Sequence, residues 1–184
     1  MGEPSAEAHL VDAVTRGSLE EVNEILEREK GLNVNNCGEA IAAAHDQHRW
    51  NSSSSGSLLH ICSSTYEADG GAPRVMMPLL VRLLQAGAAV DCRDVEGRTA
   101  LHWACHGGTE WAITQLVDAG SGVNLTGDDG NTPLHVLCMS TPASRSLTGV
   151  RLLQPLLRAG ADPTIQRPDG LRPYDMCSPT CAAV

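Results

Sequence analysis

The most constraining feature of the 184-residue chain is a block of sequence that returns at a fixed interval of 33 residues. The block TALHWACHGG begins at Thr99, and its outline returns as TPLHVLCMS at Thr132. Three Ala-Gly turns each stand 13 residues before the next block position, and their alanines are Ala86, Ala119 and Ala159. A fixed period of this length predicts a solenoid of stacked units, in which no unit buries its apolar side chains alone.

Each unit contains the signals of two helices. The Thr that opens the T-x-L-H block is a good N-cap residue, a role that Ser57 fills in an earlier unit, and the Gly after the turn Ala is the expected C-cap. In the second helix, apolar residues recur at i, i+1, i+4 and i+5, which places one apolar stripe on one face. The stripes are Leu79, Leu80, Leu83 and Leu84; Ala112, Ile113, Leu116 and Val117; and Leu152, Leu153, Leu156 and Leu157.

The T-x-L-H block, the stripe and the A-G-A turn together resemble the ankyrin repeat. The resemblance implies an all-α solenoid of four to five repeats, built from stacked antiparallel helix pairs with β-hairpin fingers between them. It also implies a module that binds other proteins, as an adaptor, a scaffold or an inhibitor.

The period divides the chain into four segments. We expect an N-terminal capping repeat, then a helical and Ser-rich insertion or a decayed repeat, then three repeats, then a truncated C-terminal cap with a tail. Within the first segment, Glu21 takes a core place that is apolar in the other units, as suits the end of a stack. The four segments are residues 1–35, 36–56, 57–168 and 169–184.

Departures from the period mark the expected insertions. Two of them fall between the helices of the first and last of the three repeats, near Ser63–Arg74 and Met139–Leu147. Residues 38–50 have a helical composition, which leaves open whether they are an insertion or a repeat remnant. Pro155 lies inside the last long helix and should kink it, whereas Pro78 is expected early enough in its helix to be tolerated.

Composition and charge narrow the function classes. The formal charge is −9 and the 13 basic residues are scattered, so the chain lacks the positive stripe of a nucleic-acid binder. No apolar run has the length of a membrane span, and the acidic N-terminus is not a signal peptide. We expect the seven cysteines to be reduced thiols, which places the protein in the cytoplasm or nucleus. We also expect a monomer without stable membrane association.

Pairs of His and Cys close in sequence allow two interpretations. They offer ligands to zinc, or, as the resemblance implies, the His braces the finger by hydrogen bonding while the small Cys is buried. We favour the second interpretation and expect no metal or other cofactor. The chain shows no phosphate loop or nucleophile elbow, so we expect no enzymatic activity. The pairs are His60 with Cys62, His102 with Cys105, and His135 with Cys138.

Two positions suggest covalent modification. The last four residues, from Cys181 to Val184, have the C-a-a-X form of a prenylation box, which makes a membrane-associated adaptor the alternative function. No polybasic segment supplies the second signal that stable anchoring needs. Asn124 resembles the finger Asn that an asparagine hydroxylase modifies in ankyrin proteins, although Gly122 stands where an acidic residue is expected. The ordinary role of Asn124 would be to stabilise its turn.

The resemblance also predicts a partner-binding surface. The residue after each T-x-L-H His should point from the inner helix into a concave groove, with charged finger residues along the rim. Trp103 is the expected anchor, because Trp is enriched at interface hot spots, and its truncation should weaken binding with little effect on stability. The alternative is that Trp103 packs on neighbouring helices. The predicted residues are Ile61, Arg93, Asp94, Glu96, Trp103, His106, Asp128, Asp129, Val136 and Met139.

Overall fold

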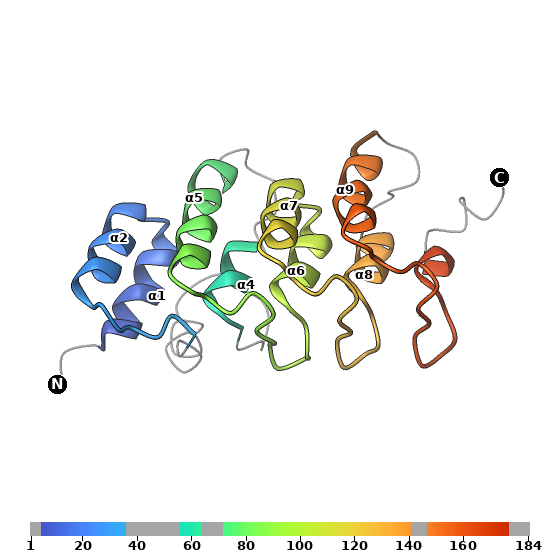
Figure 1. The fold of residues 1–184 in the computed structure, drawn as a ribbon, viewed down its shortest axis with the longest axis horizontal. Coiled ribbons are helices and arrows are strands. Elements are labelled where there is room, and N and C mark those ends of the chain that lie inside the picture. The colour runs from blue at the N-terminus through green and yellow to red at the C-terminus, as the bar shows by residue number, and fades with distance from the viewer. Residues whose placement is uncertain (1–4, 36–55, 64–71, 141–146, 177–184) are drawn as a thin grey trace.

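A computed structural model describes residues 5–35, 56–63, 72–140 and 147–176 of the chain. The proposed helix at 38–50, the prenylation box and the centres of both inter-helix insertions lie outside the described residues. Figure 1 shows the helices stacked in sequence order. The inner layer contains α1 (Ala6–Arg16), α4 (Leu58–Ser63), α6 (Ala100–Gly107), α8 (Pro133–Ser140) and the short 3-10 helix η2 (Pro173–Met176). The outer layer contains α2 (Leu19–Arg28), α5 (Ala72–Gln85), α7 (Glu110–Asp118) and α9 (Leu147–Arg158).

Packing between these helices is local along the stack. Each inner helix contacts the outer helix of its own unit and the inner helix of the next unit, and each outer helix contacts the next outer helix. The apolar stripes supply the core, with fully buried side chains such as Leu80, Ile113 and Leu156. This arrangement confirms the predicted all-α solenoid, because each unit buries its stripe against a neighbour.

Capping residues explain where the helices begin and end. The Ser5 side chain accepts a hydrogen bond from the Ala8 N–H at the start of α1, and Gly17 ends that helix at a φ of 76°. At α6 the N-terminus is closed by a capping box between Thr99 and His102. The Gly residues of the three Ala-Gly turns all have positive φ, near 86°, as their predicted C-cap role requires.

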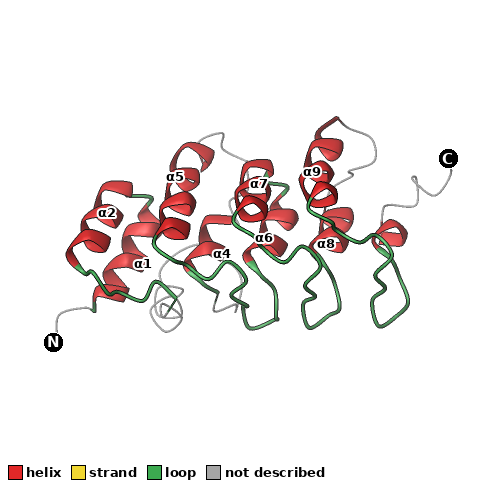
Figure 2. Ribbon diagram, in the orientation of Figure 1, coloured by secondary structure: helices red, strands yellow, loops and turns green. Residues whose placement is uncertain are grey.

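The fingers are the connections that hang along one edge of the stack (Figure 1). In Figure 2 they are drawn as loops, since no described residue belongs to a strand. The finger between α5 and α6 is a hairpin turn closed by one isolated bridge between Arg93 and Thr99. The predicted β-hairpin is therefore present as a turn with a single bridge, without the ladder of bridges that a longer hairpin has.

Pro78 and Pro155 both lie in helix interiors. Helix α5 begins at Ala72, within the predicted insertion, so Pro78 is not in the first turn and that expectation was wrong. The insertion lengthens the helix at its N-terminal end, which moves Pro78 inward. Pro155 lies inside α9 as predicted. None of the described helices combines the length and the apolar character needed to cross a bilayer.

Candidate protein-binding surface

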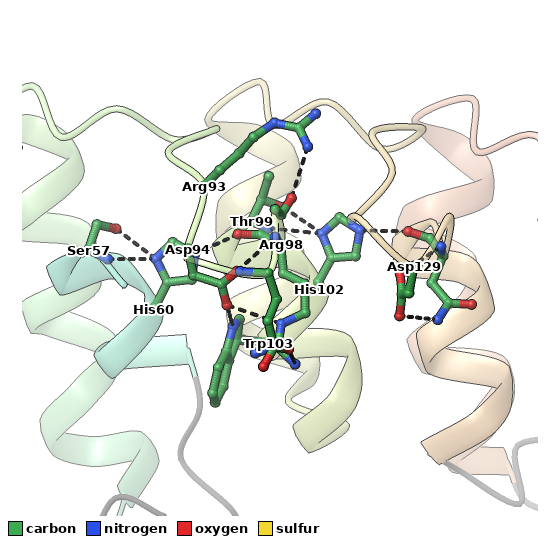
Figure 3. Close-up of polar contacts among 12 residues, drawn as sticks. Ser57, His60, Arg93, Asp94, Arg98, Thr99, His102, Trp103 and Asp129 are labelled. Carbon is green, nitrogen blue, oxygen red and sulfur yellow. Dashed lines mark hydrogen bonds and ion pairs between the residues drawn. The ribbon is translucent and has the colours of Figure 1, made fainter. Parts of the chain in front are cut away.

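Three buried histidines connect α4, α6 and α8 to the finger that follows each helix pair, and Figure 3 shows two of them, His60 and His102. At His102 the backbone N–H of Thr99 donates to ring Nδ1 at 3.0 Å, and ring Nε2 donates to the Asn131 carbonyl at 3.1 Å. Because a donor faces Nδ1 and an acceptor faces Nε2, we assign a neutral ring protonated on Nε2. The same bonds join His60 to Ser57 and Arg98, and His135 to Thr132 and Leu171. The predicted bracing role is confirmed.

Burial lowers the pKa of all three histidines below the ordinary value. At His102, which is 1% exposed, the pKa falls to about 4 because burial disfavours the imidazolium. The Asn131 carbonyl and the nearby carboxylate of Asp129 oppose this shift without reversing it. The fingers are therefore held by neutral imidazole donors at neutral pH.

Asp94 organises the finger between α5 and α6. Its side chain is 0% exposed and accepts hydrogen bonds from Trp103 Nε1 at 2.8 Å and Arg98 Nε at 3.0 Å. The backbone N–H groups of Glu96 and Arg98 also donate to it, at 2.9 and 2.8 Å. Burial alone would raise the pKa of the Asp94 carboxyl, but these bonds and the charge of Arg98 outweigh it, so the pKa lies below its ordinary value.

The Trp103 ring is fixed by this finger. Its edge meets the His60 ring with centroids 6.5 Å apart, and the Arg98 guanidinium carbon lies 4.8 Å from its centroid. Two expectations change as a result. Asp94 is buried and does not stand on the rim, because Trp103 and Arg98 satisfy its charge inside. Trp103 is half-buried and contacts His60 of α4 and Arg98, as in the alternative interpretation, and its role in partner binding stays a prediction.

Adjacent fingers are tied to each other. Arg93 Nη1 donates to the Thr126 carbonyl of the next finger at 2.7 Å. The backbone N–H of Asp128 donates to the Glu96 carbonyl at 3.0 Å. These two bonds join the first two fingers into one continuous edge.

Three carboxylates are exposed on this edge. Glu96 pairs with Arg98 Nη1 at 2.6 Å, which offsets part of its charge. Asp129 accepts the Asn131 backbone N–H at 2.9 Å, an Asx turn that orients its side chain. Asp128 is exposed beside it. The structure thus brings together four of the predicted rim charges, these three and Arg93, at the surface.

The predicted apolar positions on the inner helices differ in exposure. Ile61 and Val136 are half-buried, whereas Met139 is half-exposed at the end of α8. His106 is exposed, and its Nδ1 lies 3.0 Å from Ser140 Oγ. The exposed apolar surface on these helices therefore centres on Met139, and Trp103 contributes part of its ring.

Val95 belongs to the surface and was not predicted. It stands at a finger tip between Asp94 and Glu96, and 57% of it is exposed. The sequence contained a usable signal, since an apolar residue inside a turn that favours polar residues needs an explanation.

The turn asparagine has the ordinary role expected for it. The Asn124 side chain donates to the Gly160 carbonyl at 3.0 Å and accepts the Asp162 N–H at 2.8 Å, which links consecutive turns. Asn35 makes the equivalent two bonds with Gly87 and Ala89, between the turns that follow α2 and α5. Modification of Asn124 by a hydroxylase remains a prediction.

The three histidines have hydrogen-bond partners in place of a metal, and the cysteines beside them are buried thiols. Both ring nitrogens of His60, His102 and His135 are engaged as described above. Burial raises the pKa of the Cys62 thiol to about 12, and burial also raises that of Cys105. Within the described residues, no group of three His, Cys, Asp or Glu is placed to hold a metal ion.

Comparison with known proteins agrees with this geometry. A family model described as ankyrin repeats, in three copies, matches residues 74–167. The match runs from within α5 into the finger after α9, and it includes the exposed residues of the first two fingers. A comparison with curated proteins gave no match.

Proposed function

The chain belongs to the ankyrin repeat family, and on that premise we propose that it is an adaptor, scaffold or inhibitor that binds a partner protein through its fingers and inner helices. Ankyrin repeats form a protein-interaction module and are generally not catalytic. We further propose which surface of the chain binds the partner and which kind of partner segment it binds.

The acidic edge formed by the first two fingers carries this proposal. Finger-to-finger bonds hold the backbone of this edge, while Asp128, Asp129 and Val95 stay exposed. Because the backbone that carries these groups is already held, binding a partner costs little backbone entropy on this side. A basic and partly apolar segment complements such a surface.

The compartment is part of the proposal. None of the four described cysteines is in a disulfide, and three of them are buried. Cysteines outside disulfides support a reducing compartment, the cytoplasm or nucleus.

The test compares two charge reversals in the full chain. The partner is first captured from the source cell and identified by mass spectrometry, and its binding kinetics are then measured. We expect Asp128→Lys with Asp129→Lys to slow association about tenfold at low salt and less at high salt. The control is Glu110→Lys with Asp118→Lys, the same charge change on exposed positions of α7. Equal slowing by both pairs, or by neither, would place binding elsewhere.

A further inference from the structure

The two ends of the outer helix layer are not equivalent. Each outer helix has four stripe places, and burial shows which neighbour each place faces. The places are numbered in chain order, so that places one to four are Leu152, Leu153, Leu156 and Leu157 in α9, and Glu21, Val22, Ile25 and Leu26 in α2. Places two and four are less buried in α9, the last outer helix, than in α5 and α7. Places one and three are less buried in α2, the first outer helix. Places two and four therefore face the following helix, and places one and three face the preceding helix.

The end at α9 is left open. In place four, Leu84 and Val117 are half-buried, but Leu157 is 50% exposed. In place two, Leu80 and Ile113 are fully buried, and Leu153 is only partly buried.

The neighbouring inner position is open as well. Tyr174 occupies the Leu place of the T-x-L-H block and is 58% exposed, whereas the three Leu residues at that place are buried. The common cause is that no described outer helix follows η2. No described helix thus covers the position lined by Leu153, Leu157 and Tyr174.

The opposite end carries the complementary face. On α2, places one and three are Glu21 and Ile25, and both are half-buried because no described outer helix precedes them. The Glu21 carboxylate is paired with Arg16 at 3.2 and 2.7 Å. This end therefore offers an apolar Ile25 beside a neutralised polar pair.

We propose that the uncovered position after α9 binds α2 of a second copy of this chain, which continues the stack head to tail. Ile25 of the second copy then meets Leu153 and Leu157. The contact uses two different surfaces, so each chain keeps one free face and the assembly extends.

Charge supports this occupant. Arg151 and Arg158, seven residues apart on α9, form an exposed stripe next to Leu157. No described residue forms an ion pair with either arginine.

On α2 the matching exposed stripe is acidic. Glu20, Glu24 and Glu27 share one side of the helix, next to the Glu21 and Ile25 face. On α9, Arg158 comes one residue after the contact residue Leu157. On α2, Glu20 and Glu24 each come one residue before the contact residues Glu21 and Ile25. At 100° per residue, two parallel helices in contact place these stripes on the same side. The arginines of one copy therefore lie beside the glutamates of the next.

Glu21 and Arg28 limit the strength of this contact. Arg28 stands three residues after Ile25, on the same face of α2, and is exposed. Glu21 stands where the other outer helices have Leu or Ala, and covering it removes water from a charged pair. The association is therefore weak and depends on concentration. The chain should be the monomer expected from the sequence only in dilute solution.

The test is sedimentation velocity of the full chain from about 1 μM to about 1 mM, the range of weak association. We expect the average sedimentation coefficient to rise with concentration, and to rise less at high salt because of the charged stripes. Glu21→Leu should strengthen association about tenfold. Glu110→Arg, an exposed change on α7 outside both faces, is the control and should have no effect.

Two variants test the pairing of faces. Leu157→Glu blocks one face and Ile25→Lys blocks the other, so each protein alone should stay monomeric. An equimolar mixture should form dimers and stop there, because each dimer has two blocked ends. Circular dichroism checks that both variants are folded.

Two results would overturn the proposal. One is a wild-type chain that stays monomeric throughout the range, since no second copy then covers the face. The other is a monomeric chain in which Leu157→Glu lowers the melting temperature by several degrees, since the chain itself then covers Leu157. The finger surface of the proposed function is not involved, and its own test is unaffected by either result.

Discussion

Lowering the pH from 7 to 5 should destabilise the protein through His102. Its pKa is about 4 in the folded state, against an ordinary value of 6.5 when the chain is unfolded. Between these values the unfolded state binds more protons, so stability is fully present above pH 6.5 and is lost as the pH falls toward 4. For these two pKa values, the loss at pH 5 is about 2 kcal/mol from this residue alone.

Other groups in the same window act in the same direction. The pKa values of His60 and His135 are also lowered by burial, so the measured loss should exceed the contribution of His102. Asp94 does not interfere, because its folded pKa lies below the ordinary 3.8 and its contribution is lost only at lower pH.

Urea denaturation followed by circular dichroism at pH 7 and pH 5 measures the effect. The variant His102→Gln should be less stable at pH 7, because it loses the bonds to Thr99 and Asn131, and its pH-dependent loss should be smaller by about 2 kcal/mol. His106→Gln changes an exposed histidine and should keep the full pH dependence. If wild type and His102→Gln lose equal stability between the two pH values, the assignment of a buried neutral imidazole is refuted.

Two further predictions concern stability. Trp103→Ala should cost about 2 kcal/mol or more in urea denaturation, because it removes packing and leaves the buried Asp94 without one donor, and Trp103→Phe should cost only about 1–2 kcal/mol for the lost bond. An unchanged midpoint for Trp103→Ala would restore the sequence-based expectation that the side chain acts only in binding. Gly120→Val should destabilise by more than about 1 kcal/mol, since Gly120 has a φ of 86°. Gly31→Val is the matched control, because an added Cβ meets no atom within 4 Å at either glycine and only Gly120 has the left-handed conformation.

The repeat pattern predicted the helices because their signals are local. A cap, a stripe and a turn glycine fall within one unit, and each acts over a few residues. The bracing histidines were also predictable, since the resemblance assigns them a fixed role. The position of Pro78 was not, because it depends on how many inserted residues join α5, and helix composition does not fix that boundary.

The candidate surface was only partly predictable for a different reason. Asp94 looks like an ordinary turn residue in the sequence, and its burial depends on Trp103, which stands nine residues later. Only the folded finger brings the indole N–H to the carboxylate. Exposure of Val95 follows from the same event, because the side chains on either side of it turn toward Arg98.

The position of each finger depends on the repeat before it. His102 lies on α6, and its partner Asn131 is in the finger 29 residues later. His60 and His135 bond the finger that follows their own helix pair in the same way. A change at one bracing histidine therefore acts on the next finger along the chain. Because the fingers are also tied to each other through Arg93 and Asp128, such a change reaches the acidic edge without altering any residue on it. Loss of partner binding in His60→Gln or His102→Gln would then report a displaced finger, and the exposed carboxylates need not have been touched.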